Sequence, residues 1–269
     1  MNTLLSITAI VLYLLASYRL GTSLVGMSSE NMRPGRTLFY IFGCLAIIFH
    51  TVVLYQNINS AAGFNLGFFN ALSLMSWTIS LMVLAATISK PLENLGLVIF
   101  PVTALALLLE LVFHSTYIIP DTLPAGLRVH IILSICAYSL LSIATLQAIF
   151  LAIQDKQISN KHPARIMQMP PMQIMEDLLI QIIAIGFFIL SLSLATGLMF
   201  INDIFAQHLI HKTFLSALAW LIFGILLWGR WAWGWRGKRA IRWTIGGFVA
   251  LMLAYFGSKF VLELILHRV

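Results

Sequence analysis

The side chains of this sequence that are best suited to hold a metal are histidines. The chain has seven of them, and five lie in or next to the ends of long apolar runs. These five are His50, His114, His130, His208 and His211. Neutral imidazole is the commonest protein ligand for metals, and it also binds haem iron. For His162 and His267, in polar or terminal segments, we expect no such role.

Two of these histidines occupy equivalent places, because His130 and His211 each precede or begin a long apolar run. If the two runs form neighbouring helices, their imidazole rings could coordinate one iron from opposite faces. His50 lies inside another apolar run and is a candidate for a second ligand site. A zinc site has little support, because no HExxH motif is present and the HxxH spacing of His208 and His211 is weak evidence.

Glu110 is the one charged residue well inside an apolar run. It lies one helical turn before His114, so the two side chains share a helix face. An ionisable group within a membrane span is a functional candidate, and we count Glu110, His114 and His208 as accessory candidates. A contact of Glu110 with His114 and a contact with a lipid headgroup are both open.

Other chemistry is poorly represented, and we expect no enzymatic activity. We find no nucleophile beside a base, no phosphate-binding loop and no carboxylate pair across a pocket. Glu176 and Asp177 are adjacent at the start of an apolar run, where acidic residues suit the helix dipole. Cys44 and Cys136 are far apart and form no CxxC motif, so neither zinc binding nor covalent haem attachment is indicated. We therefore expect no catalytic residue and no metal other than haem iron.

The elements that must position the histidines are membrane-spanning helices. Hydrophobic residues make up 60% of the chain and charged residues 9%, against about 25% charged in a soluble domain. We predict eight runs of spanning length, at about 3–19, 38–56, 68–88, 95–114, 129–153, 178–201, 213–229 and 243–264. Lipid offers no hydrogen-bond partners to the backbone, so these runs must be helical. The expected fold is all-α, one polytopic membrane domain over residues 1–269, with a polar loop at about 154–177.

The distribution of positive charge predicts the orientation. Most Lys and Arg residues fall in the connections that follow the first, third, fifth and seventh runs. They are Arg19, Arg33, Arg36, Lys90, Lys156, Lys161, Arg165, Arg230, Arg236, Lys238, Arg239 and Arg242. By the positive-inside rule these connections are cytoplasmic, which puts both termini and the five histidines toward the outer face of a bacterial inner membrane. The basic, Trp-rich block from Leu226 to Trp243 is then a membrane boundary, and nucleic acid is not an expected partner.

Four segments carry a resemblance to a known family. They are "LRVHIILSICAYSLLSIATLQAIFLA" (127–152), "HKTFLSALAWLIFGILLWGR" (211–230), "GWRGKRAIRWTIGGFVALMLAYFG" (234–257), and "FHTVVLY" followed by "GFNLGFFNALSLMSW" (49–77). Nearly the whole chain resembles the cytochrome c assembly protein family (the CcsA and CcmC superfamily), and most closely its small eight-helix HemX/YpjD-type branch.

The resemblance implies a role in haem handling or cytochrome c-type biogenesis, with haem b held between His130 and His211 at the outer face. His50 resembles the family's intramembrane histidine. Two features depart from the family pattern: the segment "INDIFAQHLIHK" lacks the Trp-rich haem loop, and Trp228 stands where a second intramembrane histidine is usual. The alternative is a non-haem accessory protein that regulates haem synthesis or modulates a transport or ion-handling partner. Lipid, haem and membrane or cytochrome-biogenesis proteins are the expected partners.

Overall fold

A computed structural model describes residues 2–25, 29–60, 63–113, 117–119, 122–160, 171–200 and 207–257. Side chains are described within these ranges except at 2, 24–25, 29–35, 60 and 207–211. The chain divides into two compact units, unit 1 from Met1 to Thr122 and unit 2 from Leu123 to Val269. Each unit is described below by itself.

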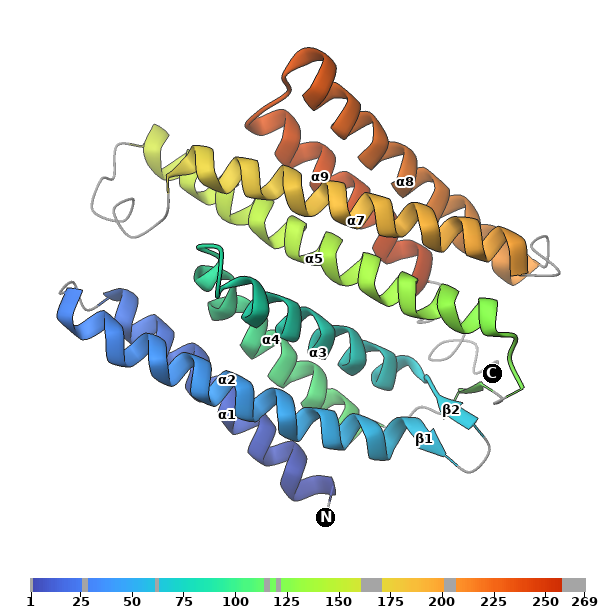
Figure 1. Ribbon diagram of the computed structural model, residues 1–269, viewed down its shortest axis with the longest axis horizontal. Coiled ribbons are helices and arrows are strands. Elements are labelled where there is room, and N and C mark those ends of the chain that lie inside the picture. The colour runs from blue at the N-terminus through green and yellow to red at the C-terminus, as the bar shows by residue number, and fades with distance from the viewer. Residues whose placement is uncertain are drawn as a thin grey trace. The chain divides into compact units, whose positions relative to one another are not determined.

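Unit 1 is built from four helices. Their bounds are α1 Asn2–Val25, α2 Ser29–Ile58, α3 Phe68–Ala86 and α4 Glu93–Val112. Helix α1 packs on α2, α2 on α3, α3 on α4, and α4 again on α1, so the four helices surround one core (Figure 1). That core contains the fully buried rings of Tyr13, Phe39 and Phe100. Phe39 stacks on Phe100 with 5.2 Å between ring centroids, and Gly96 leaves room for the Phe39 ring.

A three-stranded antiparallel sheet lies at one end of unit 1. It consists of β1 Asn59–Ser60, β2 Gly63–Asn65 and β3 Ile118–Ile119, in the order β1-β2-β3. The sheet ties the end of α2 to the segment that follows α4. The side chain of Asn65 reinforces this tie, because its Oδ1 accepts hydrogen bonds from the backbone N–H groups of Gly67 and Tyr117. The pattern of apolar runs does not predict this sheet.

Unit 2 is also a four-helix arrangement. Its helices are α5 Ala125–Ser159, α7 Met172–Phe200, α8 Gln207–Trp233 and α9 Lys238–Met252, and α9 continues into a short π-helix, η1, at Leu253–Gly257. Helix α5 packs on α7 and α9, and α8 packs on the same two helices (Figure 1). Helices α5 and α8 therefore lie diagonally across the unit, each flanked by α7 and α9.

The eight predicted spans are confirmed. Within the described residues, eight helices are long and apolar enough to cross a membrane, so the chain is an all-α polytopic membrane protein. The predicted loop at 154–177 is too long, because α5 continues to Ser159 and α7 already begins at Met172. With 35 residues, α5 is about 52 Å long at 1.5 Å per residue, which exceeds the roughly 30 Å hydrocarbon core. Its polar last turns can thus stay helical in water.

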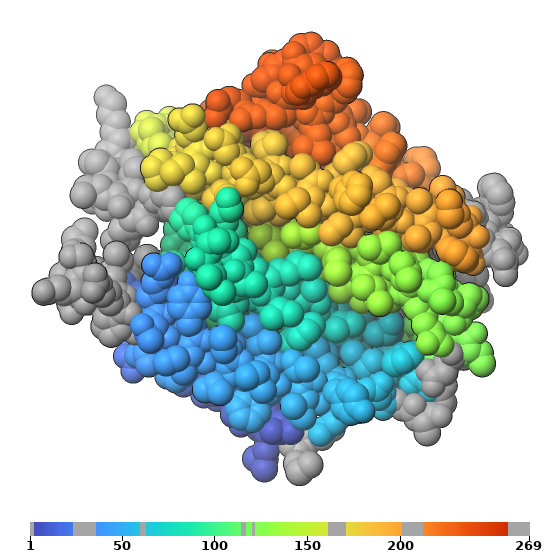
Figure 2. Space-filling view, in the orientation of Figure 1, coloured from blue at the N-terminus to red at the C-terminus, as the bar shows by residue number. Residues whose placement is uncertain are grey.

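The outer surface of each unit suits lipid. Large apolar side chains are exposed on every helix, among them Val11, Ile48, Val102, Ile132 and Phe188, and such a surface would not persist in water. Many hydroxyl side chains within the spans bond back to the carbonyl one turn earlier in their own helix, so they bring no unsatisfied polar group into the lipid. Figure 2 shows that, on the face in view, side chains fill the spaces between neighbouring helices within each unit.

Candidate functional site

His130 lies in the second turn of α5, where its ring is fixed against α7. Its Nδ1 atom is 2.8 Å from the backbone carbonyl oxygen of Ser193. The ring also lies directly over Gly197, since a Cβ atom added there would come within 2.9 Å of the His130 Cε1 atom. Only a residue without a side chain leaves this space for the imidazole.

The backbone beneath this ring is held as well. The hydroxyl of Ser134 donates to the carbonyl of His130 at 2.7 Å and pairs with the hydroxyl of Ser193 at 2.8 Å. Ser193 therefore contacts α5 twice: its carbonyl accepts from the imidazole of His130, and its hydroxyl pairs with the hydroxyl of Ser134. The two helices are pinned together at the level of His130.

The contact with Ser193 determines which nitrogen of His130 is available. A carbonyl oxygen can only accept a hydrogen bond, so Nδ1 must carry the proton. In the neutral ring Nε2 then holds the lone pair, and among the described residues it has no hydrogen-bond partner. A half-buried imidazole whose Nδ1–H is bonded to a carbonyl, with the lone pair on Nε2, matches the usual arrangement of metal-binding histidines.

The other histidine candidates are less fully described. His208 and His211 lie in the first turns of α8, and their side chains are outside the described set. His114 lies outside the described residues altogether. Helices α5 and α8 begin at the same end of unit 2 (Figure 1), but they are diagonal rather than adjacent. The predicted pairing of His130 with His211 across one iron thus requires a group that spans the unit, and it stays a prediction.

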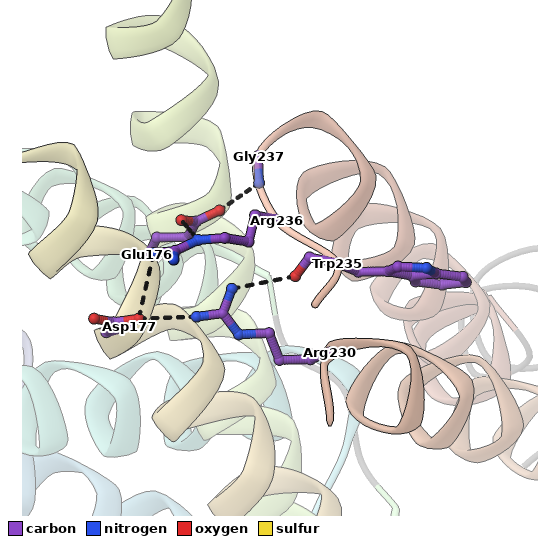
Figure 3. Close-up of polar contacts among 6 residues, drawn as sticks. All are labelled: Glu176, Asp177, Arg230, Trp235, Arg236 and Gly237. Carbon is purple, nitrogen blue, oxygen red and sulfur yellow. Dashed lines mark hydrogen bonds and ion pairs between the residues drawn. The ribbon is translucent and has the colours of Figure 1, made fainter. Parts of the chain in front are cut away.

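The opposite end of unit 2 carries a cluster of charges (Figure 3). The carboxylate of Glu176, 5% exposed, accepts from Nε of Arg236 at 2.8 Å and from the backbone N–H of Gly237. Asp177 pairs with Nη2 of Arg230 at 3.0 Å, and Nη1 of Arg230 donates to the carbonyl of Trp235 at 3.3 Å. The hydrogen bond that Arg236 donates to the Glu176 carboxylate raises the pKa of Arg236 above its ordinary value. We call these six residues the α7 clamp.

Glycines shape the loop that the clamp holds. Gly234 and Gly237 have φ of 63° and 55°, a region that favours glycine. The Trp235 ring rests on Gly229, where an added Cβ would lie 2.5 Å from the indole, and the guanidinium of Arg239 stands over the same ring. The basic, Trp-rich block is thus a folded hairpin end tied to α7. The interpretation of Glu176 and Asp177 as simple helix-dipole partners is incomplete, because both carboxylates bind arginines of this hairpin.

In unit 1, His50 and Glu110 are both buried, at 0% and 4% exposure. The two ring nitrogens of His50 are engaged: Nδ1 is 3.3 Å from the hydroxyl of Tyr13, and Nε2 is 2.9 Å from the hydroxyl of Ser73. Iron coordination by His50 would have to break one of these hydrogen bonds. Oε1 of Glu110 accepts a hydrogen bond from Nδ2 of Asn57 at 2.9 Å. Contacts of this carboxyl with His114 or with a lipid headgroup stay predictions.

The partners of these histidines were not predicted. Ser193 acts through its carbonyl and Gly197 through its missing side chain, and neither gives a chemical signal in a single sequence. Tyr13 and Ser73 did carry a weak signal, because each is a polar residue in the middle of an apolar run. Trp228, which stands where the family has a histidine, is exposed on α8 and contacts Trp231 edge to face.

These features define a polytopic α-helical membrane protein with a fixed histidine at one end of its second helical unit. Residues 38–266 match the family model described as "Cytochrome C assembly protein". The chain is 34% identical over 259 residues to "Inner membrane protein YpjD" of Escherichia coli K12, covering 93% of this chain and 97% of that protein. The protein belongs to the cytochrome c assembly family, and this membership indicates a haem-related role in a membrane.

A more distant relative is the "Uncharacterized 28.8 kDa protein in nifR3-like 5'region" of Azospirillum brasilense. It is 29% identical over 140 residues, which cover 51% of this chain and 52% of that protein. No solved structure matches the chain.

Proposed function

We propose that the protein binds haem b at the end of unit 2 where α5 and α8 begin, with His130 as one axial ligand and His211 as the other. The observation that carries the proposal is the 2.8 Å contact between Nδ1 of His130 and the Ser193 carbonyl, from which we infer the tautomer with a lone pair on Nε2. The space over Gly197 that the ring fills supports it. Both features prepare Nε2 for a metal before any metal arrives, and such preparation raises ligand affinity.

His211 is the second ligand because of its place on α8. His211 is the fifth residue of α8, and His130 is the sixth residue of α5. The two helices lie diagonally across the unit and begin at the same end of it. Haem iron would supply one-electron redox chemistry there, and the chain's own residues would bind and orient it. We propose binding and transfer of haem for cytochrome c-type biogenesis, without turnover of a substrate.

The charges of unit 2 support an external position for this site. His130 and Asp155 lie on the same helix, twenty-five residues apart, a rise of about 37 Å. That distance exceeds the hydrocarbon core of roughly 30 Å. Asp155 pairs with Lys238 beside the α7 clamp, at the basic end. Because basic loops stay in the cytoplasm, the His130 end faces outward.

Haemin titration of the purified protein tests the proposal. His130→Ala and His211→Ala should each lower haem affinity by about tenfold or more and change the Soret band. His162→Ala, in the basic connection between α5 and α7, should bind as the wild type does and serves as the matched control. Equal binding by all four proteins would refute the ligand assignment. A wild type that does not take up haemin would instead favour the accessory or regulatory role without haem, which the Trp-free segment 201–212 already suggests.

A further inference from the structure

One face of helix α9 is exposed along its length and continues into η1. Its positions are Arg239, Arg242, Gly246, Val249 and Leu253. They recur every three or four residues, so they lie on one side of the helix. The opposite side is buried where α9 packs on α5 and α8. We call these five positions the α9 stripe.

The two arginines that begin the α9 stripe carry charge that no described carboxylate neutralises. The acidic side chains at this end of unit 2 are engaged elsewhere, two by arginines of the α7 clamp and Asp155 by Lys238. Neither Arg239 nor Arg242 forms an ion pair with any residue that the structure describes. The guanidinium of Arg239 stands 5.9 Å from the centroid of the Trp235 ring, a cation–π contact that steadies it and leaves its N–H groups for an acceptor. Two neighbouring guanidinium groups are therefore available to an anion.

Beyond the arginines the α9 stripe becomes apolar and leaves room beside the helix. Gly246 lies one turn past Arg242, and no heavy atom of the described residues lies within 4 Å of a Cβ added there. Val249 and Leu253 follow with exposed apolar side chains. From Arg242 to Leu253 the helix rises about 16 Å over eleven residues, close to half of a hydrocarbon core of roughly 30 Å. The stripe therefore offers charge at one end and an apolar track about one leaflet long.

We propose that the α9 stripe binds one anionic phospholipid. The guanidinium groups of Arg239 and Arg242 donate to its phosphate oxygens. One acyl chain lies along the apolar track from Gly246 to Leu253. Guanidinium N–H groups match the oxygens of a phosphate group in charge and geometry. A positive loop in the cytoplasm needs no particular helix face, so orientation alone does not require that both arginines align with the apolar track.

The order of charge along the α9 stripe favours a lipid over a second copy of the chain. A phospholipid carries its phosphate at one end and its apolar chains at the other, in the same order as the stripe. In a two-fold dimer through this face, with its axis along the membrane normal, the arginine pairs of both copies would meet. Like charges in contact repel each other, whereas an anionic headgroup neutralises them.

Native mass spectrometry of the purified full chain measures lipid binding and oligomeric state together. Phosphatidylglycerol and phosphatidylcholine with identical acyl chains are the probes, and the α9 stripe predicts one phosphatidylglycerol bound more tightly than phosphatidylcholine. Arg239→Gln and Arg242→Gln should each lower the phosphatidylglycerol affinity about fivefold, the effect of one basic residue at an anionic lipid surface. Gly246→Leu keeps both arginines and should lower this affinity about fourfold for each acyl methylene that it displaces.

Lys238→Gln is the matched control. It removes the same charge beside Arg239, but Lys238 pairs with Asp155 and is not part of the α9 stripe, so the lipid affinity should stay that of the wild type. Equal affinity of the wild type for the two lipids would overturn the proposal. So would an equal loss in Lys238→Gln, or displacement of the lipid by free glycerol phosphate. A wild-type dimer that the arginine variants dissociate would assign this face to a second copy instead. None of these outcomes depends on haem at His130.

Discussion

Replacing Gly197 by alanine should weaken haem binding without removing any ligand. The added Cβ would lie 2.9 Å from Cε1 and 3.1 Å from Nδ1 of His130, whereas ordinary contacts begin at 3.4 Å. The imidazole must therefore move by about 0.5 Å, which is enough to lengthen its 2.8 Å hydrogen bond to Ser193 beyond the normal range. The ring would lose the partner that fixes its tautomer and its direction.

The size of this effect follows from the two interactions that are disturbed. A weakened hydrogen bond costs about 0.5–1.5 kcal/mol, and an overpacked contact costs about 1–3 kcal/mol. Loss of a group that orients a metal-binding histidine typically lowers affinity by about 10–100-fold. We expect Gly197→Ala to lower haem affinity within that range and to lower the unfolding temperature modestly.

Haemin titration with parallel thermal unfolding measures both effects. Gly246→Ala on α9 is the control, because nothing lies within 4 Å of a Cβ added there, and alanine favours a helix over glycine by about 1 kcal/mol. It should bind haem as the wild type does. If Gly197→Ala binds haem with wild-type affinity and an unchanged spectrum, the role assigned to the His130–Ser193 contact is wrong.

Two further substitutions test unit 2 away from the histidine. Glu176→Gln removes the charge that holds Arg236 and should lower the free energy of unfolding by about 1–3 kcal/mol. Asp155→Asn loses only a 3.8 Å pair with an exposed lysine and should lower it by less than about 1 kcal/mol. Equal effects of the two substitutions in thermal unfolding would contradict the stabilising role of the α7 clamp. Tyr138→Phe removes the hydroxyl that donates to the Leu251 carbonyl at 2.7 Å. It should lower the free energy of unfolding by about 1 kcal/mol and speed amide hydrogen exchange in η1. Unchanged exchange would show that this hydrogen bond does not hold η1 in place.

The spans were predictable because the bilayer allows few structures. A run of apolar residues of sufficient length must be a helix in lipid, and all eight were found. The helix ends were less predictable where chain leaves the lipid. In water both helix and loop satisfy the backbone, so composition did not show that α5 runs on to Ser159 or that α7 starts at Met172.

The site was predictable only in its ligand candidates. His130 was singled out because it is one of five histidines in or next to the ends of apolar runs, and its role as a ligand stays a prediction. Its partners depend on the register between α5 and α7, which one sequence does not contain, and on a backbone carbonyl and a glycine, which carry no functional group. The α7 clamp was not predicted for a similar reason. Glu176 lies sixty residues before Arg236, and a favourable interaction with the helix dipole already accounted for an acidic residue at this position.

The absorption spectrum of the protein purified from membranes, oxidised and then reduced, tests the central claim most directly. Haem held by two imidazoles predicts a Soret band that shifts on reduction, with sharp low-spin bands at longer wavelength, and His130→Ala should lose this signature. A colourless protein that also fails to take up added haemin would contradict the claim.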